Sequence, residues 1–407
     1  MLELYKRIDF VLICSLLGLL IMGLLALYSS SYSGQESTTQ TNHFLKQLGW
    51  IVIGLVSVVI VYFIPHRWIY SSAYIFYGIS LFFLFLIFFI GKVGLGAERW
   101  LQLGPFSFQP SELAKVASVL AVARYVSHEE TDLNNPKYFL IAGSFLVIPF
   151  AMIIRQPDLG TSMVFLAMAL PMFYWAGLQL SNLLLIIVPF FVMLASFSFS
   201  TFLILMILLV GYLIYSRRTK IVFITVFLTN IIMGLLTPVL WNHLKPYQQN
   251  RIKIFLNPES DPRGAGYQII QSKVAIGSGG SLGKGFMQGS QTQLRFLPEQ
   301  HTDFIFAVIA EEFGFLGALT GLILFLILII RNIQIAAMVR NKFNSIVIIG
   351  ITTIIFFHVS VNLGMAVGLL PVTGLPLPFI SYGGSSLVTN MIMIGIVLNF
   401  YKNRFEY

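Results

Sequence analysis

Long apolar stretches alternate with short polar segments along most of the chain. Twelve of them approach the length of about 20 residues that a helix needs to cross a bilayer. Backbone polar groups in hydrocarbon must be paired within their own segment, so such stretches are expected to be helical. The pattern predicts an all-α integral membrane protein, a polytopic bundle of about twelve transmembrane helices. The stretches cover residues 10–29, 47–64, 69–90, 111–126, 138–154, 160–176, 182–196, 201–216, 221–240, 303–330, 345–369 and 385–400.

The region around residue 200 allows two interpretations. The stretches 182–196 and 201–216 are both short, and only the sequence SFSFS (196–200) separates them. They could form two spans, or one bent or interfacial segment.

The positive charges of the short loops predict the orientation. Lysine and arginine recur in alternate loops, at residues 6–7, 124, 217–220, 331–342 and 402–404. Cytoplasmic loops carry such an excess, so both termini are predicted to be cytoplasmic. Residues 241–302 then form one large extracytoplasmic loop, and loops of this length in compact proteins are usually functional.

A second segment on the same predicted side, Leu370 to Ser386, contains three prolines and three glycines. This composition cannot form a simple span. It indicates a re-entrant or broken element, which is tolerated at membrane depth where it faces a cavity.

Composition supports the membrane assignment. The chain is 57% hydrophobic and 10% charged, whereas soluble domains carry about 25% charged residues. The net charge of +9 would suggest nucleic acid binding in a soluble protein. Here most of it is the excess of lysine and arginine that orients a membrane protein, and no nucleic acid partner is expected. The single cysteine excludes an intramolecular disulfide and a cysteine-based metal site.

Two short motifs match known patterns and fail on context. Residues 279–283 fit G-x-S-x-G, but the strand and helix of a nucleophile elbow are not predicted around them. Gly283 and Lys284 resemble the end of a P-loop, yet Ser278 and Gly285 break that pattern. The glycines more simply permit tight turns.

Ionisable residues in or beside apolar stretches are costly and mark function or internal pairing. Glu112 and Lys115 are three residues apart, so they share a helix face. They either neutralise each other or line a polar cavity. Arg155 and Asp158 flank another span end. They either line the same polar cavity or form an ion pair with each other at the membrane interface.

Asp303 stands at the start of the stretch that follows the large loop. It is either a functional carboxylate or a carboxylate in the first helical turn that the helix dipole stabilises, with Thr302 as the cap. Glu311 and Glu312 lie deeper in the same stretch, and a structural role is expected for them.

Together these residues outline a polar cavity on the outer face that suits an anionic, lipid-linked substrate. Its predicted lining comprises the cations Arg99, Lys115, Arg155 and Lys273, the acids Glu112, Asp158 and Asp303, and the aromatic residues Trp100 and Tyr382. No metal-ligand set is predicted.

Five long segments resemble the SEDS family (shape, elongation, division and sporulation proteins), typified by RodA, FtsW and SpoVE. They are ERWLQLGPFSFQPSELAK (98–115), RQPDLGTSM (155–163), NPESDPRGAGYQIIQSKVAIGSGG (257–280), FLPEQHTDFIFAVIAEEFGFLG (296–317) and NLGMAVGLLPVTGLPLPFISYGGSS (362–386). The chain looks most like RodA, the elongation-type branch. The resemblance covers nearly the whole chain apart from roughly 182–240.

The resemblance implies a single SEDS-type domain over residues 1–407, in the bacterial cytoplasmic membrane. Such a protein would be a peptidoglycan glycosyltransferase that polymerises lipid II at the outer face during cell elongation. A class B penicillin-binding protein and the elongation machinery would be its partners. Asp303 matches the family's essential aspartate, and Trp100, Glu112 and Lys115 match other sensitive positions. The family usually has ten spans, so the count of twelve is a departure within 182–240.

In the predicted mechanism, Asp303 is the general base for the acceptor sugar hydroxyl. The outer-face cations, with a divalent cation (Mg²⁺ or Mn²⁺) as a candidate, would stabilise the departing pyrophosphate. A lipid II flippase is the alternative, and it should place polar residues along a path through the bilayer. A non-catalytic scaffold is a third possibility and would not need Asp303.

Overall fold

The structure is a computed structural model of the chain. It describes residues 8–31, 43–90, 92–94, 97–103, 106–217, 219–244, 249–250, 253–255, 257, 261 and 265–405.

Each predicted apolar stretch forms a helix. The helices are α2 (Phe10–Ser31), α3 (His43–Phe63), α4 (His66–Ile90), α5 (Pro110–Val126), α6 (Pro136–Arg155), α7 (Leu159–Trp175), α8 (Leu180–Ala195), α9 (Phe199–Tyr215), α10 (Lys220–His243), α14 (Ile305–Met338), α15 (Lys342–Ala366) and α16 (Gly384–Lys402). The largest difference from the predicted bounds is at the end of α14, which continues to Met338. The polar residues after position 330 ended the apolar pattern there, but Arg331 and Gln334 among them are good helix formers.

Eight of the described helices are long and apolar enough to cross a membrane, namely α2, α3, α4, α6, α10, α14, α15 and α16. Helices α7, α8 and α9 are apolar but shorter. α5 is a continuous helix of 17 residues whose apolar sequence is interrupted by Glu112, Lys115 and Arg124. The fold is therefore a polytopic all-helical membrane protein, as predicted. Twelve crossings and cytoplasmic termini stay predictions.

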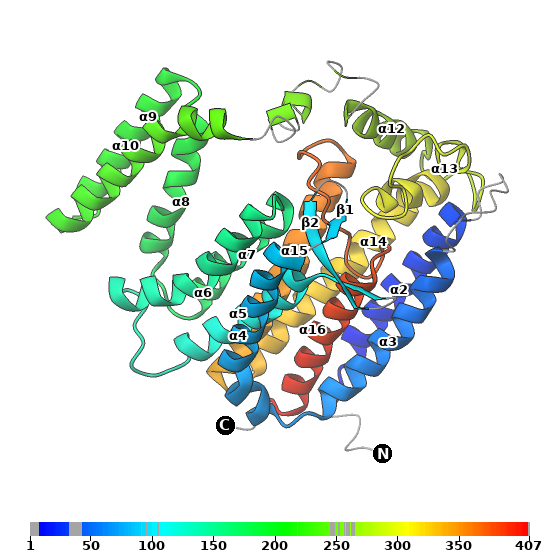
Figure 1. Cartoon of the computed structure of the whole chain (residues 1–407), viewed down its shortest axis with the longest axis horizontal. Coiled ribbons are helices and arrows are strands. Elements are labelled where there is room, and N and C mark those ends of the chain that lie inside the picture. Colours follow the sequence, from blue (N-terminus) through cyan, green and yellow to red (C-terminus); the bar gives the residue numbers. More distant parts are fainter. Residues whose placement is uncertain are drawn as a thin grey trace.

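Helices α15 and α16 form the centre of the main bundle (Figure 1). In the most apolar part of each, 78% of α15 and 72% of α16 is buried, against 17% for α3 and α10. α16 packs against α3, while α15 packs against α5, α7 and α14. A helix that is apolar on all sides belongs in such a central position.

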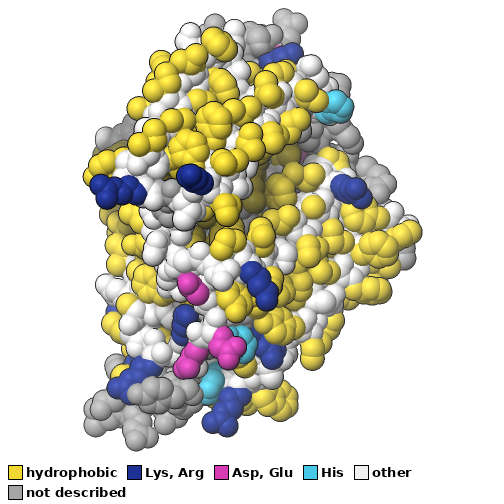
Figure 2. All heavy atoms as spheres, turned by 90° about the vertical axis from the view of Figure 1, so that its left-hand side faces the viewer, with side chains coloured by type: hydrophobic (Ala, Val, Ile, Leu, Met, Phe, Trp, Pro, Cys, Tyr) yellow, Lys and Arg dark blue, Asp and Glu magenta, His cyan; other side chains and the backbone are white. Residues whose placement is uncertain are grey.

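Helices α8, α9 and α10 lie to one side of this bundle (Figure 1). They share a small apolar core of their own, made of Leu185, Val192, Met206, Leu209 and Leu213. Figure 2 looks at this side and shows hydrophobic side chains over most of it, as expected for a surface that faces lipid. α8 and α9 are separate helices joined by a turn at residues 196–198. Whether they make two spans or one bent segment stays a prediction, because both are shorter than the eight candidate spans.

Three short antiparallel strands connect α4 to α5, and the apolar pattern did not predict them. They are β1 (Lys92–Gly94), β2 (Ala97–Leu103) and β3 (Phe106–Phe108), in the order β1-β2-β3. Trp100 lies opposite Lys92, and Leu101 lies opposite Phe108. β2 contacts both α4 and α5.

The prediction of one uninterrupted loop over 241–302 is wrong in part, because this region contains α12 (Ala265–Ser278) and α13 (Ser290–Gln293). Ile269, Ser272 and Ala275 are buried, and their spacing of three places them on one face of α12, which packs against α14 and α15. The expected glycine turns are present, since Gly280 and Gly283 have φ angles of +59° and +82°.

Candidate functional site

Segments far apart in sequence meet near the beginning of α14. The hydroxyl of Ser381 donates to the carbonyl of Thr302 (2.6 Å), and the backbone N–H of Tyr382 donates to the carbonyl of His301 (2.9 Å). The segment between α15 and α16 is therefore fixed against the residues that precede α14. Residues 371–377, which we call the irregular segment, have no regular secondary structure, as predicted for a broken element.

Asp303 lies in the turn before α14 and not in the helix. The N-cap is Phe304, which makes no side-chain capping bond, and no acidic residue lies in the first turn. The expectation that Thr302 caps the helix is therefore wrong, because the helix begins two residues later than the apolar pattern indicates. The Thr302 hydroxyl donates to the backbone carbonyl and carboxylate of Glu299 instead.

The carboxylate of Asp303 lies beside the backbone of Gly374. A β-carbon added at Gly374 would be 3.7 Å from Oδ2 of Asp303, and Gly374 has a φ of +77°, which favours glycine. The backbone carbonyl of Asp303 accepts a hydrogen bond from the side-chain amide of Asn362 (3.0 Å). Asp303 is half-buried, so the turn holds its carboxylate at the edge of the protein interior.

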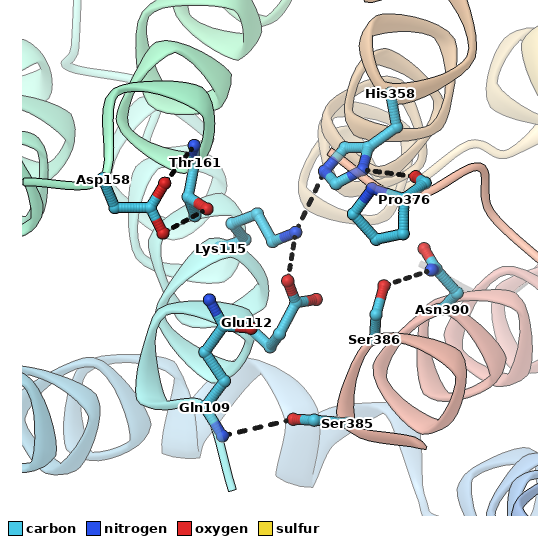
Figure 3. A network of polar contacts seen from close by, with 10 residues as sticks. All are labelled: Gln109, Glu112, Lys115, Asp158, Thr161, His358, Pro376, Ser385, Ser386 and Asn390. Atoms are coloured by element: carbon cyan, nitrogen blue, oxygen red, sulfur yellow. Dashed lines mark hydrogen bonds and ion pairs between the residues drawn. The ribbon is translucent and has the colours of Figure 1, made fainter. Parts of the chain in front are cut away.

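Glu112 and Lys115 form the ion pair that their spacing allowed. Nζ of Lys115 is 2.9 Å from Oε1 of Glu112, and the residues are only 1% and 3% exposed. Lys115 also contacts Nε2 of His358 at 3.0 Å (Figure 3). Oε2 of Glu112 is buried and has no hydrogen-bond partner among the described residues. The pair is thus more than self-neutralising, because it offers a free acceptor and a third partner.

Asp158 is buried at the beginning of α7, a helix that contacts α5 (Figure 3). Its carboxylate accepts hydrogen bonds from the backbone N–H (3.1 Å) and the hydroxyl (2.9 Å) of Thr161, so it caps α7. Arg155 ends α6 and is exposed. Gly160 brings α7 against the irregular segment, since an added β-carbon would lie 2.7 Å from the carbonyl of Thr373.

The remaining predicted site residues lie around this centre. Trp100 is half-buried in β2, and the side chain of Arg99 lies outside the described part of the structure. The exposed Lys273 of α12 lies over Gly368. Tyr382 packs edge-on against His43, with ring centroids 4.6 Å apart, and burial raises the pKa of its phenol.

His301 also belongs to this aromatic group. Its ring stacks on that of His43 with centroids 4.3 Å apart. Burial lowers the pKa of His301, and the carboxylate of Glu299 partly offsets this effect. The neutral form of His301 is therefore favoured beside Asp303.

Glu311 and Glu312 are both buried, and their contacts are structural. The carboxylate of Glu311 accepts hydrogen bonds from Lys284 (2.8 Å) and from the backbone N–H groups of Gln291 (2.9 Å) and Thr292 (3.1 Å). Glu312 accepts a hydrogen bond from Ser29. The two residues tie the α12–α14 connection and α2 to α14.

The sequence analysis missed His358 and Asn362. Both are buried polar residues in a largely apolar helix, and His358 is ionisable, which is the signal that identified Glu112 and Lys115. Within the described residues, no group of three or more His, Cys, Asp or Glu side chains is placed to hold a metal ion. A divalent cation therefore stays a prediction.

Comparison with known proteins identifies relatives over nearly the full length. A family model for FtsW, RodA and SpoVE, described as cell cycle protein, matches residues 10–199 and 180–405. The peptidoglycan glycosyltransferase MrdB of Escherichia coli strain K12 is 38% identical over 98% of this chain and 94% of its own length. The peptidoglycan glycosyltransferase RodA of Treponema pallidum is 36% identical over 96% of each chain.

A solved structure gives the same result for the fold. Its subject is the structural coordination of polymerization and crosslinking by a peptidoglycan synthase complex. One chain of that complex matches with a TM-score of 0.74 and 29% identity, over 98% of this chain and 99% of its own.

Proposed function

We infer that this chain, which belongs to the FtsW/RodA/SpoVE family of cell cycle proteins, is a peptidoglycan glycosyltransferase of the bacterial cytoplasmic membrane. The observation that carries this conclusion is the 38% identity to MrdB over 98% of the chain. The apolar helices make it a multi-pass membrane protein. The relatives MrdB and RodA support a Rod-type role in cell shape and elongation.

We propose that the substrate is lipid II, a disaccharide-pentapeptide on undecaprenyl pyrophosphate. The carboxylate of Asp303 takes the proton of the acceptor sugar hydroxyl. The hydroxyl oxygen then bonds to the anomeric carbon of the donor sugar. The bond from that carbon to the pyrophosphate oxygen breaks, and its electron pair leaves with the lipid pyrophosphate. Asp303 is half-buried in the turn before α14 and is not part of the helix, and this position supports the role.

Lys115 supplies positive charge for the pyrophosphate, and Glu112 orients its ammonium group. The free Oε2 of Glu112 accepts a hydrogen bond from the substrate. Because the pair is buried, its electrostatic interactions are screened less than they would be in water. Arg99, Trp100, Arg155, Asp158, Lys273 and Tyr382 are proposed as the outer part of the same substrate site.

We propose a class B penicillin-binding protein as the partner that crosslinks the new strands. The matched solved structure, a peptidoglycan synthase complex in which polymerization and crosslinking are coordinated, supports this assignment. We further propose that the reaction takes place at the outer face of the membrane and that both termini lie in the cytoplasm. Residues 1–407 would then form one SEDS-type domain.

The test is to incubate the purified protein, with and without this partner, with lipid II and to score glycan chains by length. The wild-type protein is expected to make long chains, and the Asp303→Asn variant is expected to make them at least about a hundredfold more slowly. A wild-type protein that moves lipid II across vesicle membranes without polymerising it would favour the flippase.

A further inference from the structure

His358 and Asn362 lie four residues apart on α15, so they occupy one face of that helix. They are 2% and 0% exposed. Burial of polar groups at this depth is costly unless their hydrogen bonds are made. Both side chains bond to other segments and not to their own helix.

The two contacts of His358 fix its tautomer. Nε2 lies 3.0 Å from Nζ of Lys115, and Nδ1 lies 3.3 Å from the carbonyl oxygen of Pro376. A lysine ammonium only donates and a carbonyl only accepts. His358 is therefore neutral, accepts from Lys115 at Nε2 and donates from Nδ1 to Pro376.

Asn362 makes the matching connection to the aspartate. Its side-chain amide nitrogen donates to the carbonyls of both Asp303 (3.0 Å) and Leu375 (2.9 Å). Leu375 and Pro376 are consecutive, so the two α15 side chains hold adjacent carbonyls of the irregular segment. That segment also carries Gly374, whose backbone lies beside the Asp303 carboxylate.

We propose that His358 and Asn362 are positioning residues. They fix the position of the Lys115 ammonium group of α5 relative to the Asp303 carboxylate before α14. This inference rests on the roles proposed above for Lys115 and Asp303. Neither α15 side chain touches substrate. His358 acts through Lys115, and Asn362 acts through the backbone of Asp303.

The experiment compares His358→Leu with His358→Gln in purified protein supplied with lipid II, with kcat and KM measured separately. Leucine removes both contacts, whereas glutamine can still accept from Lys115. His358→Leu is expected to lower kcat by about tenfold to a hundredfold, the scale of a lost hydrogen bond to a charged group. His358→Gln is expected to restore most of that loss.

A double variant separates positioning from general stability. If His358 acts through Lys115, then His358→Leu combined with Lys115→Met should be no slower than Lys115→Met alone. The matched control is Thr353→Val on the same helix. The Thr353 hydroxyl is also buried but donates to Ile349 within α15, so this variant should keep wild-type activity.

Two results would overturn the inference while the proposed function stands. One is an active wild-type protein whose His358→Leu variant keeps its full kcat. The other is a His358→Leu loss that multiplies fully with the Lys115→Met loss. A wild-type protein that makes no glycan would overturn the proposed function and this inference with it.

Discussion

The centre of the bundle and the α8–α10 group use buried polar residues in different ways. In α10, Asn230 and Thr237 are buried, and their hydrogen bonds return to the carbonyls of Val226 and Met233 in the same helix. In α15, His358 and Asn362 bond to three other segments. The hydrogen bonds of Asn230 and Thr237 stay within α10, whereas those of His358 and Asn362 connect α15 to the site.

This difference explains where the family motifs lie. A lipid-facing helix needs only apolar side chains, and many of these are interchangeable. Helices that hold a charge at a fixed position need particular partners at particular distances. The described parts of the five motif segments accordingly lie in or against α5, α14 and α15, and the 182–240 region contributes none of them.

The largest expected effect is that of Asp303→Asn. The variant keeps the shape of the side chain but cannot accept a proton, so glycan synthesis should fall by about a hundredfold or more. Because Asp303 does not cap α14, the melting temperature should stay close to that of the wild type. Asp303→Glu should restore little, since its extra methylene moves the carboxylate by about 1 Å. Glycan synthesis at the wild-type rate by the Asp303→Asn protein would refute the general-base role.

The next largest effect concerns the ion pair of α5. Lys115→Met leaves Glu112 buried and unpaired, and it should lower the polymerisation rate by about tenfold to a hundredfold. Exchanging the two residues (Glu112→Lys with Lys115→Glu) should not restore activity, because the new carboxylate would face the acceptor nitrogen of His358. Rates should be compared at equal amounts of folded protein. Recovery in the exchanged variant would mean that the two residues only neutralise each other.

The apolar pattern predicted the helices well and the connections poorly. Each stretch became a helix because lipid allows few alternatives. The strands between α4 and α5 were missed, since they are short and depend on pairing between segments. α12 was missed because its buried face includes Ser272, a polar residue whose hydroxyl donates to the carbonyl of Ala366.

The sequence selected residues for the candidate site but did not reveal the contacts that connect them. Asp303, Glu112 and Lys115 could be selected because charges near apolar stretches are costly. The link from Lys115 through His358 to Pro376 joins α5, α15 and the irregular segment, and spacing along the chain cannot reveal such contacts. The same holds for Thr302, whose expected capping role failed because the turn bonds it to Glu299.

A smaller effect, on stability, is expected at Glu311. Glu311→Leu leaves the buried N–H groups of Gln291 and Thr292 without their acceptor, which should cost about 2–3 kcal/mol. Protease cleavage between α12 and α14 should then become faster. Lys284→Met is the matched control and should cost less, because Lys284 is 28% exposed and the Glu311 carboxylate keeps its hydrogen bonds from Gln291 and Thr292. Equal cleavage rates in the two variants would show that Glu311 does not anchor this connection.

The smallest effect on activity is expected in the α8–α10 group, and it tests the comparison most directly. Leu213 is 1% exposed in the core of that group, and Leu387 is 2% exposed in α16, just after the irregular segment. Both leucine-to-alanine changes remove the same atoms and should cost about 2–5 kcal/mol of stability. Leu213→Ala should leave kcat within about twofold of the wild type, because no hydrogen bond of the Lys115–Asp303 connection passes through α9. Leu387→Ala should lower kcat severalfold, since a shift of α16 displaces the segment that holds Pro376 and Gly374. If Leu213→Ala lowers kcat as much as Leu387→Ala, then the α8–α10 group takes part in catalysis, and the division between the two regions is wrong.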